Sequence, residues 1–203
     1  MSFKKLHPHL LEVLEQKSID QPNPFQKKSI PVIKSGAHVF CTAPKNSGKT
    51  TTLILTTLQK LKCEALDHAP RAVVLVENKE KALELYERFL EFTKRTSLRV
   101  YVGYKELHID IQKSELFEGA DILITTPTNL HKLFLTNGVS TSQLQLCSID
   151  DGDFLTKQSE YSAMITVTQS IMKCQYVLYA EKLAPKLKRF EAYFMERAQY
   201  IKS

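Results

Sequence analysis

The chain has 203 residues, 43% of them hydrophobic, and carries 28 Lys and Arg residues against 22 Asp and Glu, which gives a formal net charge of +6. This length predicts one α/β domain over residues 1–203 and excludes a two-domain machine, while the interleaving of acidic with basic residues leaves a polyanionic partner open. The four cysteines form no Cys-x-x-Cys pair and no apolar run approaches the ~20 residues that span a bilayer, so we expect no zinc, no disulfides, no membrane partner and a cytoplasmic protein.

The first 36 residues are expected to hold an N-terminal helix and, after it, a separate segment that contains Gln26. Four leucines recur at helical spacing, at Leu6, Leu10, Leu11 and Leu14. This spacing is typical of an amphipathic helix, and the breaker-rich residues 20–24 should end it.

Residues 43–50 read Ala-Pro-Lys-Asn-Ser-Gly-Lys-Thr, between an apolar run at 38–41 and a helix-compatible stretch at 51–63. A strand, a tight turn and a helix in this order direct backbone N–H groups and the positive end of the helix dipole at a phosphate. Lys49 would supply a charge for the terminal phosphates, and Thr50 a hydroxyl for magnesium. We therefore predict a nucleotide-binding loop, with an ordinary surface turn as the alternative; its residues are Ala43, Asn46, Ser47, Gly48, Lys49 and Thr50.

Two residues of this loop depart from the common pattern. Ala43 replaces the first glycine, and Asn46 stands where many such loops have another glycine. Asn46 is the milder change, because Asn tolerates left-handed backbone conformations better than most residues.

Beyond the loop, the sequence alternates strand and helix. Apolar and β-branched runs predict strands at residues 72–76, 99–102, 122–125, 144–149 and 176–179. Helical patterns lie between them, at residues 82–90, 109–117, 129–136, 161–172 and 184–195. This alternation predicts a doubly wound, mainly parallel sheet with helices on both faces, in which ligands bind at the carboxyl ends of the strands.

The run at 144–149 is followed by Asp-Asp-Gly-Asp at 150–153. A carboxylate directly after an apolar strand can hold magnesium through water, and a second one can orient an attacking water. We assign the first role to Asp150 and the second to Asp151. An acidic turn that closes the strand is the simpler alternative.

Taken together, these motifs resemble the first RecA-like domain of the DEAD-box RNA helicases. The resemblance rests on Ser-Ile-Asp-Gln-Pro-Asn-Pro-Phe-Gln at 18–26, the phosphate loop and residues 150–153. Weaker matches follow in the family's order: 77–82 for Pro-Thr-Arg-Glu-Leu-Ala, 103–104 for Gly-Gly, 126–129 for Thr-Pro-Gly-Arg and 178–181 for Ser-Ala-Thr. The resemblance covers essentially the whole chain and implies a RecA-like sheet of about seven strands, the last one near Tyr200 and Ile201.

The same resemblance implies ATP with Mg²⁺ as the ligand. In the family, the glutamine at the position of Gln26 reads the adenine edge, and an aromatic residue at the position of Phe3 packs on the base. An amide both donates and accepts, which suits adenine. Thr50 and Asp150 would hold the metal, partly through water. A solvated Gln26, and a Phe3 that only packs on the first helix, are the alternatives.

RNA is the second partner that the resemblance implies. The positions that correspond to the family's RNA-facing residues are Lys79, Gly103, Thr126, Pro127 and Asn129. Lys79 keeps the charge of an arginine without its bidentate fork, and Asn129 loses a charge. Tyr104 replaces a glycine and could stack on a base or pack on the surface. We expect weak, salt-sensitive RNA binding.

Other departures affect the reaction. Asp151 is one methylene shorter than the family's glutamate, so its carboxylate could lie too far from an attacking water. Tyr179 and Glu181 replace the hydroxyls of Ser-Ala-Thr. A second RecA-like domain, or a protein partner in trans, would have to supply the arginine fingers that stabilise the transition state.

Three interpretations follow. The first is an ATP-binding helicase-type domain in which Lys49, Asp150 and Asp151 are catalytic and which remodels RNA together with a second domain. The second is a degenerate, non-hydrolysing ATP-binding module that regulates or tethers a partner. The third is a different P-loop NTPase, which a preference for GTP would support.

Overall fold

The computed structural model describes residues 3–203, and its centre is one sheet of seven parallel strands in the order β3-β4-β2-β5-β6-β1-β7. The strands are β1 (Val39–Thr42), β2 (Ala72–Leu75), β3 (Val100–Val102), β4 (Ile122–Thr125), β5 (Leu146–Ile149), β6 (Gln175–Ala180) and β7 (Gln199–Lys202). This arrangement confirms the predicted doubly wound parallel sheet.

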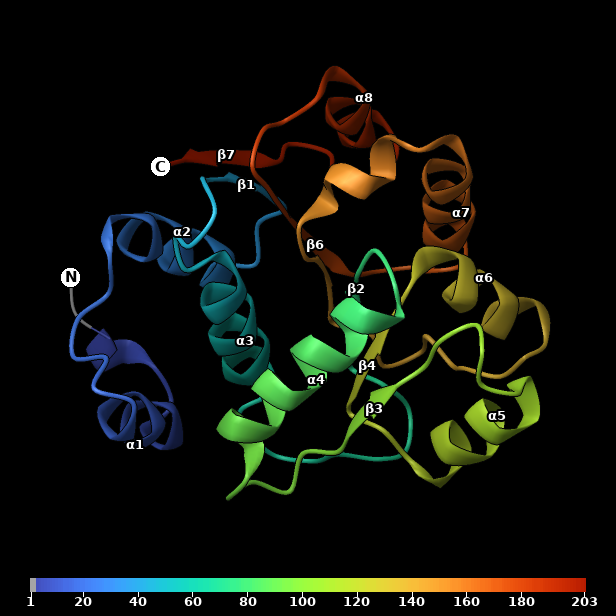
Figure 1. The fold of residues 1–203 in the computed structure, drawn as a ribbon, viewed down its shortest axis with the longest axis horizontal. Coiled ribbons are helices and arrows are strands. Elements are labelled where there is room, and N and C mark those ends of the chain that lie inside the picture. Colours follow the sequence, from blue (N-terminus) through green and yellow to red (C-terminus); the bar gives the residue numbers. More distant parts are fainter. Residues whose placement is uncertain (1–2) are drawn as a thin grey trace.

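Helices cover both faces of the sheet (Figure 1). One face carries α1 (Pro8–Gln16), α2 (Pro24–Lys34), α3 (Lys49–Lys60) and α4 (Lys79–Thr93). The other carries α5 (Ile109–Glu118), α6 (Pro127–Leu135), α7 (Gln158–Gln169) and α8 (Pro185–Lys188).

The split of the helices follows from the path of the chain across the sheet. From β1 to β3 the chain moves towards one edge of the sheet, and from β3 to β7 it moves back across it. Right-handed crossovers place helices on opposite faces when the direction reverses. The loops after β1 and β5 therefore lie at the carboxyl ends of the strands, and they lead to helices on opposite faces of the sheet. Ligands of such sheets bind at this edge.

Alternate side chains of each strand enter two separate hydrophobic clusters. Val39 and Cys41 of β1 pack towards α1 to α4, whereas Phe40 between them packs towards the other face. Because both faces are buried, the strands are apolar throughout, as central parallel strands are. The two edge strands are the exceptions, since β3 is half-buried and β7 is mostly exposed.

Two helical expectations need correction. Residues 24–34 form α2, a helix that was not predicted; Pro24 is accepted in its first turn, and Pro31 lies inside it. The single helix expected at 184–195 is instead the short α8 followed by a 3-10 turn at Arg189–Ala192. Among residues 3–203, no helix is both long and apolar enough to cross a membrane.

Candidate functional site

The predicted phosphate loop is a tight turn between β1 and α3. Asn46 and Gly48 have φ angles of +60° and +83°, so the left-handed conformation that Asn tolerates is the one it adopts. A Cβ at Gly48 would lie 2.8 Å from Asn23 Nδ2 and 3.1 Å from Gln26 Nε2. Glycine is thus required at 48 by both backbone conformation and space.

Asn23 and Gln26 connect α2 to this loop. They form a reciprocal cap, in which Gln26 N donates to Asn23 Oδ1 at 2.9 Å and Asn23 N donates to Gln26 Oε1 at 3.0 Å. Asn23 Nδ2 in turn donates to the Ser47 carbonyl at 2.9 Å. Gln26 is 4% exposed, so it is a capping residue beside the loop rather than a solvated one.

Lys49 is the buried cation of the loop. Its amine donates to the carbonyls of Ala43 at 2.9 Å and Pro44 at 3.1 Å. It also lies 3.6 Å from Asp151 Oδ1. The structure therefore brings Lys49 and Asp151 together across the carboxyl edge of the sheet.

Thr50 and Asp150 meet at the base of the same cleft. The Thr50 hydroxyl lies 3.4 Å from both carboxylate oxygens of Asp150. Burial, and secondly the charge of Asp151, raise the pKa of Asp150 to about 6, although Arg88, Thr50 and Lys49 act in the opposite direction. A divalent cation would favour the ionised carboxylate and so oppose this shift.

The site fits a nucleotide with magnesium. The Ser47 hydroxyl is buried and has no hydrogen-bond partner among the described residues, so a ligand could satisfy it. A cavity of about 480 Å³ lies beside the loop residues on either side of Ser47, Asn46 and Gly48, and is also lined by Lys49, Thr50 and Asp150. Residues 3–203 contain no group of three His, Cys, Asp or Glu side chains placed to hold a metal, so phosphate and water would complete the shell around Thr50 and Asp150.

Apart from the RNA-facing residues, the remaining predicted positions are either acidic residues after β5 or buried aromatic residues. Asp151 has a half-exposed side chain and a φ of +44°, whereas Asp153 accepts a hydrogen bond from Glu181 N at 3.1 Å. Tyr179 is completely buried behind the loop, and its hydroxyl finds no partner among residues 3–203. Phe3 is also buried, in the cluster that contains α1.

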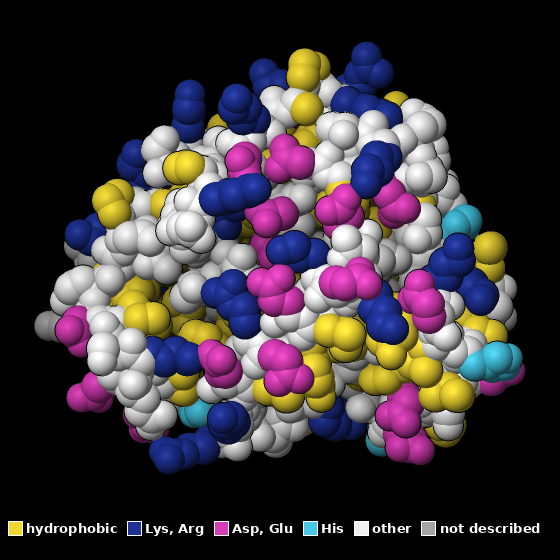
Figure 2. Space-filling model, in the orientation of Figure 1, with side chains coloured by type: hydrophobic (Ala, Val, Ile, Leu, Met, Phe, Trp, Pro, Cys, Tyr) yellow, Lys and Arg dark blue, Asp and Glu magenta, His cyan; other side chains and the backbone are white. Residues whose placement is uncertain are grey.

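The predicted RNA-facing residues lie at the ends of β2, β3 and β4. Lys79 is half-buried, and its amine lies 4.7 Å from the centre of the Tyr104 ring. Thr126 caps α6 by accepting from Asn129 N. Figure 2 shows basic side chains interspersed with acidic ones over this view rather than gathered in one patch.

Asn129 does not reach the surface. It is 3% exposed, and its Nδ2 donates to Gln112 Oε1 at 2.8 Å and to Thr125 Oγ1 at 3.0 Å. A Cβ at Gly103 would lie 2.7 Å from Gln112 Oε1. A direct contact of the Asn129 side chain with RNA is therefore not supported. Gln112 Nε2 also donates to the Tyr104 carbonyl at 3.0 Å, so this buried amide network instead joins α5 and α6 to the segment that carries Gly103.

Sequence reasoning missed the contribution of α4. Lys81, Glu84 and Arg88 line the phosphate cavity together with the loop. Their spacing of three and four residues places them on one face of a helix, but nothing in the sequence shows that this face meets a loop 30 or more residues away.

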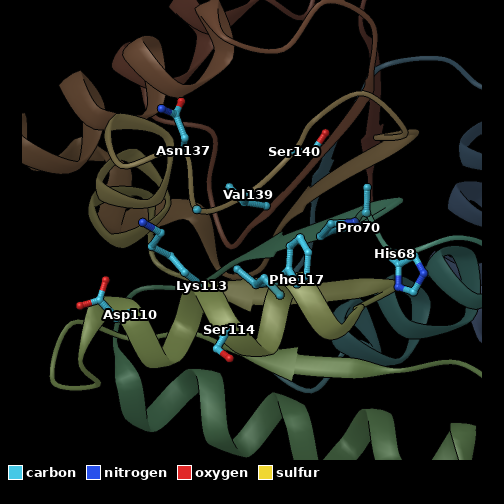
Figure 3. Close-up of a pocket in the computed structure, with 12 residues that line it drawn as sticks. His68, Pro70, Asp110, Lys113, Ser114, Phe117, Asn137, Val139 and Ser140 are labelled. Carbon is cyan, nitrogen blue, oxygen red and sulfur yellow. The ribbon is translucent and has the colours of Figure 1, made fainter.

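A second and larger cavity, of about 670 Å³, lies away from the phosphate loop (Figure 3). It is bounded by α5, by the segment that leads into β2 and by the loop after α6, and Phe117 and Val139 contribute apolar surface to it. No residue of the phosphate loop lines it. The chemistry assigned above belongs to the smaller, more polar cavity.

Comparison with known proteins gives one consistent answer. A family model described as DEAD/DEAH box helicase matches residues 23–180. The chain is 28% identical over 182 residues to the ATP-dependent RNA helicase ddx54 of Dictyostelium discoideum, covering 90% of this chain and 17% of that protein. It is 31% identical over 150 residues to the ATP-dependent RNA helicase DBP10 of Meyerozyma guilliermondii, covering 74% of this chain and 16% of that protein. The chain thus spans about a sixth of the length of these relatives.

Solved structures show the same fold. A DEAD box protein from the hyperthermophile Methanococcus jannaschii matches all of this chain and 56% of its own, with a TM-score of 0.89 and 16% identity. A Dbp5 variant of S. cerevisiae bound to RNA and ADP BeF3 matches with a TM-score of 0.87 and 20% identity, over 100% of this chain and 52% of its own. The sheet described above is therefore a RecA-like fold.

Proposed function

Because the chain belongs to the DEAD/DEAH box helicase family, we propose that it is an ATP-binding RecA-like domain that takes part in ATP-dependent RNA binding or remodelling. The observation that carries the proposal is the meeting of Lys49, Thr50 and Asp150 at one cavity on the carboxyl edge of the sheet. These three side chains provide the cation, the hydroxyl and the carboxylate that a magnesium nucleotide needs.

The loop residues have separate tasks in this proposal. The backbone N–H groups at the start of α3 bind phosphate oxygens, and Lys49 exchanges its contacts with the Ala43 and Pro44 carbonyls for contacts with phosphate. Thr50 and Asp150 would hold magnesium, which neutralises the charge of the phosphates when it is bound. Asn23 and Gln26 keep the loop in place and put the Gln26 amide beside it.

Hydrolysis depends on Asp151. Its carboxylate now points at Lys49, at 3.6 Å, and must move to orient a water molecule. We propose that turnover by this domain alone is slow and that a second RecA-like domain or a partner in trans supplies the missing arginines, as the family relationship suggests. RNA would bind along Lys79 and Tyr104, weakly and with strong dependence on salt.

The second candidate is a non-hydrolysing ATP-binding module. Its support is Tyr179, which stands in the core where the family has a small hydroxyl residue, so the link from nucleotide to RNA through that position is lost. The names of the relatives, ATP-dependent RNA helicases, favour the first candidate.

Titration of the protein with ATP and GTP in magnesium, read as thermal stabilisation, tests the proposal. We expect stabilisation that is selective for ATP and absent in Lys49→Ala. Turnover is measured in parallel with and without RNA. RNA-stimulated turnover supports the first candidate, stabilisation without turnover supports the second, and a preference for GTP supports a different P-loop NTPase. No stabilisation by any nucleotide would contradict all three.

A further inference from the structure

Arg88 reaches the phosphate cavity from a neighbouring helix. It lies in the third turn of α4, and its Nη2 donates to Thr51 Oγ1 at 3.3 Å. Thr51 directly follows Thr50 at the start of α3. The guanidinium therefore sits at the rim of the cavity that Lys49, Thr50 and Asp150 also line.

The four cations around this cavity differ in their partners. Lys45 lies 3.6 Å from Glu181, Lys49 lies 3.6 Å from Asp151, and Lys81 lies 3.1 Å from Glu84. Arg88 has no carboxylate within ion-pair distance among residues 3–203, although Glu84 lies one helical turn before it. Among the described residues, Arg88 is thus the cation of this cavity that forms no ion pair, although its positive charge also acts on the Asp150 carboxylate.

The position of Arg88 is fixed by the helix that carries it. Leu85 and Phe89, which flank Arg88 along α4, are buried in the core, so the helix cannot rotate to turn Arg88 away. One N–H of the guanidinium bonds to Thr51, which leaves the remaining donors for another acceptor. A planar fork of donors suits the oxygens of a phosphate.

We propose that Arg88 is a nucleotide-positioning residue that binds non-bridging phosphate oxygens of the nucleotide from the side of α4. This inference rests on the proposed binding of ATP and names a residue that adds to it. It gives the site a second phosphate-binding cation in cis, beside Lys49. The alternative is that Arg88 only ties α4 to α3 through Thr51.

The test is the dissociation constant of ATP and of ADP for Arg88→Gln, measured by calorimetric titration of the whole chain in magnesium. Glutamine keeps a donor for Thr51 but loses the charge. We expect the affinity for both nucleotides to fall about tenfold, the size of one charge-assisted contact. The affinity of Arg88→Lys should lie between those of the unmodified protein and Arg88→Gln. Arg95→Gln is the matched control, because Arg95 is exposed beyond the end of α4 and does not line the cavity.

The outcomes separate this inference from the proposed function. If the unmodified protein binds ATP and Lys49→Ala does not, but Arg88→Gln binds as tightly as Arg95→Gln, only the inference about Arg88 is overturned. If the unmodified protein binds no nucleotide, both fail. Melting temperatures without nucleotide identify a purely structural role, since that role predicts that Arg88→Gln melts lower while its nucleotide affinity is unchanged.

Discussion

The amine of Lys49 and the carboxylate of Asp151 lie 3.6 Å apart, so the cation that should bind phosphate already faces an anion. A nucleotide must approach Lys49 against this negative charge. Asp151 is 50% exposed, so water and salt screen the repulsion.

Asp151→Asn should therefore strengthen ATP binding. We expect a gain of about two- to fivefold at low ionic strength, which corresponds to less than about 1 kcal/mol, and a smaller gain in 0.5 M salt. Titration calorimetry at both salt concentrations measures it. Asp110→Asn, an exposed acid on α5 outside the phosphate cavity, is the control. Weaker binding by Asp151→Asn would mean that Asp151 orients Lys49 instead of opposing the ligand.

Asp150 should make stability depend on pH. Its pKa is raised to about 6 from an ordinary 3.8, so the folded protein holds this proton more tightly than the unfolded chain. The ionised carboxylate therefore costs stability, a cost that grows from about pH 4 to pH 6 and is fully present above pH 6. Asp150→Asn should raise the melting temperature by about 2–4 °C at pH 7.5, and by less at pH 5. An equal gain at both values would contradict the assignment.

The same group should control magnesium. Because the metal needs the carboxylate, the part of the ATP affinity that EDTA removes should decline as pH falls below about 6. In Asp150→Asn, the loss of ATP affinity caused by EDTA should be small at every pH. The measurement is ATP affinity with magnesium and with EDTA, between pH 5 and pH 8.

Gly48→Ala and Gly36→Ala form a matched pair. Both glycines have positive φ, +83° and +90°, but a Cβ at 48 meets Asn23 Nδ2 at 2.8 Å whereas nothing lies within 4 Å at 36. We expect Gly36→Ala to cost about 1 kcal/mol from backbone strain alone. Gly48→Ala should cost more, about 2–3 kcal/mol, and should also abolish nucleotide binding. Urea denaturation measures the stability of each, and equal losses would show that the contact with Asn23 is unimportant.

Replacing Tyr179 by the serine of the family pattern should lower the stability of the protein. Its hydroxyl is buried without a partner among the described residues, so Tyr179→Phe should stabilise the protein by up to about 1 kcal/mol. Tyr179→Ser should leave a cavity behind the phosphate loop and cost about 3–5 kcal/mol. Denaturation midpoints compare the two. A Tyr179→Ser protein of unchanged stability would show that the core can close around serine.

Lys79 should contribute to RNA binding as a phosphate contact. Lys79→Ala should weaken binding of single-stranded RNA uniformly across sequences and reduce the slope of affinity against salt by about one. Fluorescence anisotropy at several salt concentrations measures both. Lys62→Ala is the control, because Lys62 is exposed at the end of α3, at the opposite edge of the sheet.

The sheet and the phosphate loop could be predicted because their signals are local. Each buried strand is a short apolar run, and residues 43–50 carry the turn and the helix start in their own sequence. α2 was missed for a local reason as well. Residues 20–24 were interpreted only as a break after the first helix, but Pro24 begins the helix that Asn23 caps.

The features of the site that could not be predicted depend on contacts between segments that are distant in the sequence. Arg88 and Thr51 are 37 residues apart, and only the packing of α4 on α3 brings them together. Asn129 was placed at an RNA surface because of its position in a motif, yet its amide is used inside the protein by Gln112 and Thr125. A polar residue in a sequence does not show whether its partner is water, another side chain or a ligand.

The buried amide network has a consequence for recognition. Gln112 donates to the Tyr104 carbonyl, next to Gly103, and accepts from Asn129, so hydrogen bonds connect the segment after β3 to α5 and α6. A ligand that lies across them meets a surface that is already ordered. Binding there loses little conformational entropy, and even a few modest contacts can then yield useful affinity.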